Sequence, residues 1–224
     1  MKMRNNDCIY SEVCQLDECT DCIRYLEMSA LLRESRLPKS LQKIITLYPE
    51  DVDYDAFVRL RDIKDNITDH INNGNFNLLL YSKNTGNGKT SWAAKMLLKY
   101  FDDIWAGNGL FRRALFLNVP NFLVRSKNFG IIDSDIADIK TLLIDAKVVV
   151  WDDIASTKIS DYDNTQLLNY IEYRISNNRA NIYTANIGGL PLQDVLGNRL
   201  YSRIWNNSTR VELRGRDMRG SQDD

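Results

Sequence analysis

Short apolar runs alternate with longer amphipathic stretches along most of the chain. Five runs rich in β-branched, leucine and aromatic residues are predicted strands, at 76–81, 114–119, 148–151, 181–185 and 209–213. Apolar residues at helical spacing predict helices between them, at 90–104, 133–145 and 163–177. This alternation predicts an α/β fold, in which helices cover both faces of a parallel five-stranded sheet.

Two more amphipathic stretches precede this part of the chain. Residues 23–36 predict a helix that Leu37-Pro38 interrupts, and residues 55–73 predict a second helix that ends before Gly74. His70 lies on the second helix and is expected to be a partly exposed surface residue. We expect residues 1–36 to form a Cys-rich N-terminal module, residues 37–219 the main domain, and residues 220–224 a disordered polar tail.

Composition narrows the possible functions. The 224 residues, 44% of them hydrophobic, suffice for one main domain with a small appendage. A net charge of −1 excludes a protein that coats nucleic acid by bulk positive charge, although a local basic patch remains possible. A single histidine excludes a two-histidine zinc site and disfavours serine–histidine hydrolases. Without an apolar stretch of about 20 residues or a secretory signal, we expect a cytoplasmic protein with no membrane partner.

A glycine-rich loop lies between the predicted strand 76–81 and the predicted helix 90–104. Gly86 and Gly88 let backbone amides turn toward phosphate oxygens, Lys89 can reach the β- and γ-phosphates, and the Thr90 hydroxyl can bind Mg²⁺. The pattern G-x-x-x-x-G-K-[ST] has Lys83 at its first position, which keeps phosphate binding but leaves the loop geometry and the turnover rate open. The loop residues expected to contact the nucleotide are Asn84, Thr85, Gly86, Asn87, Gly88, Lys89, Thr90 and Ser91.

Two acids follow the fully apolar strand 148–151. We assign Asp152 to the Mg²⁺ shell and Asp153 to the activation of the attacking water. Asn186 directly follows the next predicted strand, 181–185. If that strand lies between the strand before the glycine-rich loop and the strand before the two acids, a polar residue here can hold the lytic water or sense the γ-phosphate. Together these residues predict binding of a nucleoside triphosphate with Mg²⁺.

With these motifs the chain resembles the AAA+ helicase loaders of the DnaC and DnaI type, including phage versions, with the transposition helper IstB as a near relative. The resemblance also rests on SRLP at 35–38, TAN at 184–186 as sensor 1, LGNRLYSRI at 196–204 as box VII, and ELRGRDMR at 212–219. It implies an ASCE-type AAA+ ATPase without a separate lid domain, slow unless assembled with partner or DNA. It also implies a role in loading a hexameric DnaB-type helicase onto single-stranded DNA at replication initiation, with ATP as an assembly and release switch.

Arg199 and Arg203 are four residues apart, which places them on one helix face. The resemblance implies that Arg203 is an arginine finger in the neighbouring subunit's nucleotide site and that Arg199 is a second contact or a brace. It therefore implies self-association, and it makes Arg219 a candidate nucleotide sensor. Without the resemblance, a pair of surface arginines is the better interpretation.

All four cysteines lie within the first 22 residues. Cys19 and Cys22 have knuckle spacing, and Cys8 and Cys14 could complete a four-thiolate zinc site. An iron–sulfur cluster and unligated thiols are the alternatives. The resemblance implies that this region binds the helicase, since family loaders have an N-terminal helicase-binding module that binds zinc in some members.

Residues 121–130 combine aromatic and basic side chains. Arg125, Lys127 and Phe129, with Phe122, could form a stacking surface for single-stranded DNA. The alternative is a helix that packs Phe122 and Val124 on the sheet and leaves the charges in solvent. The sequence does not divide the C-terminal arginines among nucleotide, subunit interface and DNA.

Two rival functions share the same core. One is an IstB-like transposition helper that remodels DNA. The other is a hydrolysis-deficient P-loop adaptor of a replication protein, which Lys83 favours.

Overall fold

A parallel sheet of five strands forms the centre of the molecule. The computed structural model describes residues 8–11, 14, 22–127, 133–156 and 159–218. The strands are β1 (Asn77–Tyr81), β2 (Ala114–Asn118), β3 (Val148–Asp152), β4 (Ala180–Ala185) and β5 (Thr209–Glu212). Their order is β2-β3-β4-β1-β5, and every pairing is parallel. The predicted five-stranded parallel sheet is confirmed.

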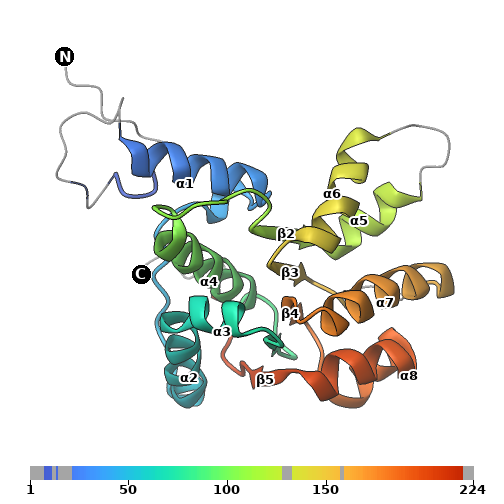
Figure 1. Ribbon diagram of the computed structural model, residues 1–224. Helices are drawn as coiled ribbons and strands as arrows, with labels where there is room; N and C mark the ends of the chain where they lie inside the picture. The colour runs from blue at the N-terminus through green and yellow to red at the C-terminus, as the bar shows by residue number, and fades with distance from the viewer. Residues whose placement is uncertain (1–7, 12–13, 15–21, 128–132, 157–158, 219–224) are drawn as a thin grey trace.

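Helices cover both faces of this sheet (Figure 1). One layer contains α1 (Ile23–Glu34), α2 (Tyr54–Asp65), α3 (Ile67–Asn73) and α4 (Lys89–Ile104), and the other contains α5 (Val119–Ser126), α6 (Ser134–Asp145), α7 (Asp161–Ser176) and α8 (Gly189–Asn207). Because side chains alternate along a strand, Leu78 and Leu80 of β1 pack with the first layer and Leu79 packs with the second. Each face therefore has its own apolar core.

The prediction of one helix over residues 55–73 was wrong. The chain breaks into α2 and α3 at Asn66, which has φ −106° and ψ 18°. The Asn66 side chain donates to the Asp62 carbonyl oxygen at 3.0 Å and to its carboxylate at 3.3 Å. A side chain that hydrogen-bonds a neighbouring backbone carbonyl in this way competes with regular helix. His70 of α3 is half-buried, and its ring stacks on that of Phe76.

Helix α1 packs in the core that also contains α4. Its Met28, Leu31 and Leu32 are buried there, and the Ser35 carbonyl oxygen that follows accepts the Phe116 N–H of β2 at 2.7 Å. A separate module over residues 1–36 remains a prediction, and the predicted tail 220–224 lies outside the described residues.

None of the helices in the described ranges is long and apolar enough to cross a membrane. After β5, the described residues 213–218 contain no helix.

Candidate nucleotide-binding site

The glycine-rich loop joins the end of β1 to the first residue of α4, Lys89, at the carboxyl edge of the sheet. Gly86 and Gly88 have φ values of +68° and +94°, a region that glycine enters without steric cost. Lys83 is exposed and does not have a positive φ. A residue other than glycine therefore fits the first position of this loop.

Lys89 is buried at the start of α4, inside the loop. Its ammonium group donates to the Asn84 carbonyl oxygen at 2.8 Å and to Asn87 Oδ1 at 2.9 Å. The N-terminus of the 16-residue helix α4 adds a positive partial charge at the same point. The loop thus places a cation and a helix dipole where an anionic phosphate would bind.

The Asp152 carboxylate lies at the end of β3, opposite the start of α4. Its Oδ1 accepts hydrogen bonds from Thr90 Oγ1 at 2.9 Å and from Thr184 Oγ1 at 2.8 Å. Burial raises the pKa of the Asp152 carboxyl above its usual value, while the hydrogen bonds from Thr184 and Thr90 act in the opposite direction. The carboxylate and the Thr90 hydroxyl are oxygen ligands of the kind that Mg²⁺ prefers, so this pair fits the predicted metal.

Asp153 and Asn186 meet across neighbouring strands. Strand β4 lies between β3 and β1, as the assignment of Asn186 required. Asn186 Nδ2 donates to Asp153 Oδ1 at 2.7 Å. The amide therefore orients the carboxylate that the sequence assigned to water activation.

These elements surround a cavity of about 520 Å³. Its polar wall contains residues 86–91, Asp152, Asp153, Thr184 and Asn186. Among the predicted nucleotide contacts, Asn84 and Thr85 do not belong to this wall.

Sequence reasoning missed a second, mostly apolar part of the cavity wall. This wall consists of Leu41, Thr46, Leu47, Tyr48, Phe57 and Met218. Phe57 packs edge-to-face against Trp92 of α4, with ring centroids 5.2 Å apart. In the sequence, the only sign of this wall is the apolar and aromatic pair Leu47-Tyr48 before Pro49. The pair is too short to show the periodicity of a helix or a strand, so it predicts no element. A wall of this kind suits a nucleobase, because the base has apolar faces and the phosphates do not.

Residues 213–218, which we call the C-terminal segment, pack on the glycine-rich loop. Asn84 Nδ2 donates to the carbonyl oxygens of Arg214 and Gly215, both at 3.0 Å, and Asn87 Nδ2 donates to that of Leu213 at 3.0 Å. These contacts explain why Asn84 turns away from the cavity. Likewise, Thr85 Oγ1 donates to the Asp217 carboxylate at 3.1 Å.

Asp53 ties the C-terminal segment to the start of α2. Its two carboxylate oxygens accept the Arg214 N–H at 2.7 Å and the Gly215 N–H at 2.8 Å, and only 3% of the residue is exposed. Glu50 adds a second contact, since its Oε2 accepts the Arg216 N–H at 3.3 Å. The buried Asp53 and the neighbouring Glu50 therefore hold the C-terminal segment against the part of the chain that precedes α2.

The two arginines of box VII lie on the second half of α8, which is broken at Gly197 with φ +71°. Arg203 Nε donates to Glu172 Oε1 of α7 at 2.8 Å. In the described part of the chain, the cavity lining includes neither Arg199 nor Arg203. Neither side chain thus belongs to the nucleotide site of its own subunit. Arg219 lies outside the described residues.

The residues predicted to bind DNA follow or form the end of α5. Phe122 is buried, as the helix alternative predicted, but Val124 is 67% exposed, so the expectation that it packs on the sheet was wrong.

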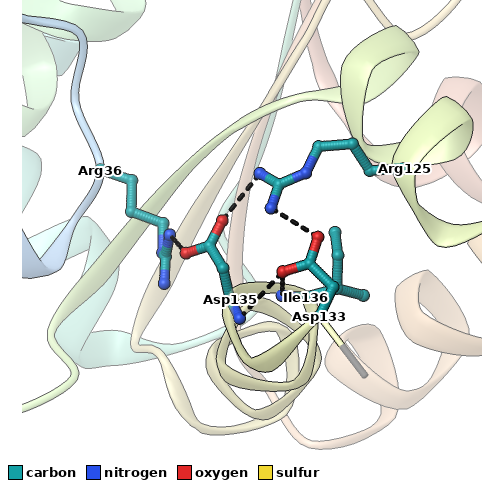
Figure 2. Close-up of polar contacts among 5 residues, drawn as sticks. All are labelled: Arg36, Arg125, Asp133, Asp135 and Ile136. Atoms are coloured by element: carbon teal, nitrogen blue, oxygen red, sulfur yellow. Dashed lines mark hydrogen bonds and ion pairs between the residues drawn. The ribbon is translucent and has the colours of Figure 1, made fainter. Parts of the chain in front are cut away.

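The two predicted DNA-binding cations are already neutralised. Arg125 pairs with Asp133 and Asp135, each at 2.7 Å, and Arg36 also binds Asp135 (Figure 2). Lys127 pairs with Asp163 at 2.6 Å. Phe129 lies outside the described residues. To bind at Arg125 or Lys127, a DNA phosphate would therefore have to replace the aspartates that already pair with these side chains.

The described residues give the zinc prediction no support. Cys8 is buried, and Cys14 and Cys22 are half-buried. Within the parts of the chain that the structure describes, no group of three or more His, Cys, Asp or Glu could hold a metal ion. Cys19, the other half of the predicted knuckle, lies outside them.

Comparison of the sequence with protein-family models gives no match, and neither does comparison with curated proteins. Solved structures do match. A DnaC helicase loader superposes with a TM-score of 0.59 and 21% identity, covering 74% of this chain and 93% of that one. DnaI superposes with a TM-score of 0.58 and 15% identity, covering 83% and 98%.

The replication initiator DnaA, bound to AMPPCP and single-stranded DNA, superposes with a TM-score of 0.57 and 13% identity, covering 77% of this chain and 49% of that one. These likenesses show that the chain shares its fold with DnaC, DnaI and DnaA. They also agree with the resemblance to DnaC and DnaI in the sequence.

Proposed function

We propose that this protein is an ATP-dependent loader of a hexameric DnaB-type helicase onto single-stranded DNA at replication initiation, in the cytoplasm of a bacterial or phage-infected cell. One observation carries the proposal: Lys89, Thr90, Asp152, Asp153 and Asn186 converge on one cavity. The fold shared with the DnaC helicase loader and with DnaI supports helicase loading as the role of this ATPase.

The cavity suits ATP in two parts. The apolar wall around Leu47 and Phe57 would hold the base, and the loop would hold the phosphates. Lys89 would exchange its two bonds within the loop for the β- and γ-phosphate oxygens. Thr90 and Asp152 would hold Mg²⁺, which neutralises charge on those phosphates when it is bound.

Hydrolysis needs a water aligned with the γ-phosphate. Asp153 would accept a proton from this water, and Asn186, which already donates to Asp153, would fix the carboxylate and contact the γ-phosphate. The remaining positive charge would come from Arg203 of a neighbouring subunit, with Arg199 as a second contact or brace. An isolated subunit receives no such arginine and is therefore expected to be a slow ATPase. In the assembly, Arg203 must leave Glu172 to reach the neighbouring site.

The ATPase would act as a switch. ATP binding would assemble subunits and favour contact with single-stranded DNA through Arg125, Lys127 and Phe129, and hydrolysis would release the loader. A ligand shifts such an equilibrium only by its differential affinity for the two states. The cysteine-bearing N-terminal region is proposed to bind the helicase, and Cys8, Cys14, Cys19 and Cys22 are proposed to bind zinc, which elemental analysis of the purified protein would test.

The deciding experiment combines hydrolysis with helicase binding. Lys89→Ala is expected to lower ATP hydrolysis by about 10²-fold or more, because it removes the cation at the phosphates. Lys83→Ala, in the same loop but exposed, is the matched control and should match the wild type. With ATP, the wild type should co-elute with its cognate helicase in size-exclusion chromatography. Failure to co-elute in any nucleotide state would refute the loader function.

The same samples separate the rival functions. Tight duplex binding, filaments and indifference to the helicase would favour the transposition helper. Equal hydrolysis by the wild type, Lys89→Ala and Asp153→Asn, with DNA and helicase present, would favour the adaptor.

A further inference from the structure

Thr184, next to the last residue of β4, connects both acids of the site. Its Oγ1 donates to Asp152 Oδ1 at 2.8 Å and accepts the Asp153 N–H at 2.9 Å. Its carbonyl oxygen accepts the Ile154 N–H at 3.0 Å. The residue is 2% exposed, so these bonds form away from bulk water.

The two acids need such a connection because they are adjacent in the chain. In a continuous strand, Asp152 and Asp153 would point to opposite faces of the sheet. Both line the cavity, because the chain leaves β3 at Asp153 with φ +60°. This left-handed conformation is unfavourable for a residue with a Cβ, and it persists only where the surroundings hold it. The bonds from Thr184 to the N–H groups of Asp153 and Ile154 supply that constraint.

We propose that Thr184 is a positioning residue of the ATPase site, which holds the Asp152 carboxylate toward the metal and fixes the turn that aims Asp153 at the water. The inference rests on the ATPase function proposed above. Thr184 itself would bind neither the phosphates nor the reacting water; it acts through the two acids. One hydroxyl thereby sets the relative orientation of the metal-binding and water-activating carboxylates.

The purely structural alternative is that Thr184 fills space between β3 and β1. Three variants of the full-length protein separate the two interpretations. Thr184→Val keeps the shape but loses the hydroxyl, Thr184→Ser keeps the hydroxyl but loses the methyl group, and Thr184→Ala loses both. Thermal melting by circular dichroism identifies the variants that fold. If Thr184→Val does not fold, the comparison uses Thr184→Ala.

The first measurement does not depend on hydrolysis. A fluorescent ATP analogue in EDTA should bind the wild type, Thr184→Val and Thr184→Ser within about twofold of one another, because the loop is unchanged. Mn²⁺ titration of the nucleotide complex, followed by electron paramagnetic resonance, should give an affinity about 10- to 100-fold weaker for Thr184→Val, as for other losses of a ligand's supporting bond. Thr184→Ser should stay close to the wild type.

The second measurement is steady-state hydrolysis with Mg²⁺. Thr184→Val should lower kcat and leave the KM for ATP nearly unchanged, and Thr184→Ser should restore kcat. Unchanged Mn²⁺ affinity and kcat in Thr184→Val would overturn the proposal, and so would a Thr184→Ser variant as impaired as Thr184→Val. A wild type that binds nucleotide and metal but never hydrolyses ATP would refute the proposed ATPase, while the Mn²⁺ affinities would still decide the role of Thr184. A wild type that binds no nucleotide would refute both.

Discussion

Replacing Asp53 by asparagine tests whether the C-terminal segment is held by the buried carboxylate. Asp53 accepts the N–H groups of both Arg214 and Gly215, and its side chain is almost fully enclosed. Asparagine keeps the shape but offers only one oxygen, so its NH₂ group would face an N–H donor. Losing a charge-assisted bond and leaving one buried N–H unsatisfied costs about 2–4 kcal/mol together. That is a large part of the 5–15 kcal/mol by which domains are typically stable.

Urea denaturation followed by circular dichroism measures this cost. Asp51→Asn, on the same short helical turn but exposed, is the matched control and should change the free energy of unfolding by less than about 0.5 kcal/mol. Asp53→Asn should also weaken nucleotide binding by about fivefold, the equivalent of one ordinary hydrogen bond, because the segment positions Asn84 and Asn87 of the loop. Equal unfolding free energies for the two variants would refute the reasoning.

Two further predictions concern the proposed arginine finger and the ion pairs of Asp135. Arg203→Ala and Lys89→Ala proteins should each be poor ATPases alone. A mixture of the two should regain part of the activity, because the first supplies an intact loop and the second an intact finger. A mixture no more active than its components would argue against a finger in trans. Burial opposes ionisation of Asp135, but hydrogen bonds from Arg36 and Arg125 outweigh it and lower the pKa of this carboxyl below its usual value. Its ion pairs (Figure 2) therefore stabilise the fold above the unfolded-state pKa of about 3.9, and the contribution is lost as the pH falls through the lower folded-state value. The wild type should exceed Asp135→Asn in urea resistance at pH 7, and the difference should shrink below pH 4; a difference that stays constant would contradict this account.

The polar half of the site could be predicted from the sequence because its chemistry sits in short contiguous motifs. The loop around Lys89 and the acids after β3 each combine a strand, a turn and a functional group within a few residues, and the predicted sheet brings them to one edge. The apolar wall could not be predicted this way. Tyr48 and Met218 are 170 positions apart, and only tertiary packing makes them neighbours.

Three further features of the structure differ from the sequence prediction or were absent from it. The apolar spacing of residues 55–73 continues through Asn66, but the side chain of this residue bonds the backbone one turn earlier and breaks the helix. The helix α5 was one of two open alternatives. It buries Phe122 but not Val124 because residues two apart on a helix do not share a face. The constraint by Thr184 was not visible in the sequence, since it depends on the position of β4 beside β3.

The packing of Phe57 against Trp92 has a practical consequence. Phe57 lines the cavity, and its ring meets the edge of an indole that is only 4% exposed. A nucleotide that displaces water from Phe57 would change the environment of that indole without touching it. Trp92 would thus report the proposed nucleotide binding through its intrinsic fluorescence. Replacing Trp105 and Trp205, which are only partly buried, would reduce the background for stopped-flow kinetics without an added dye.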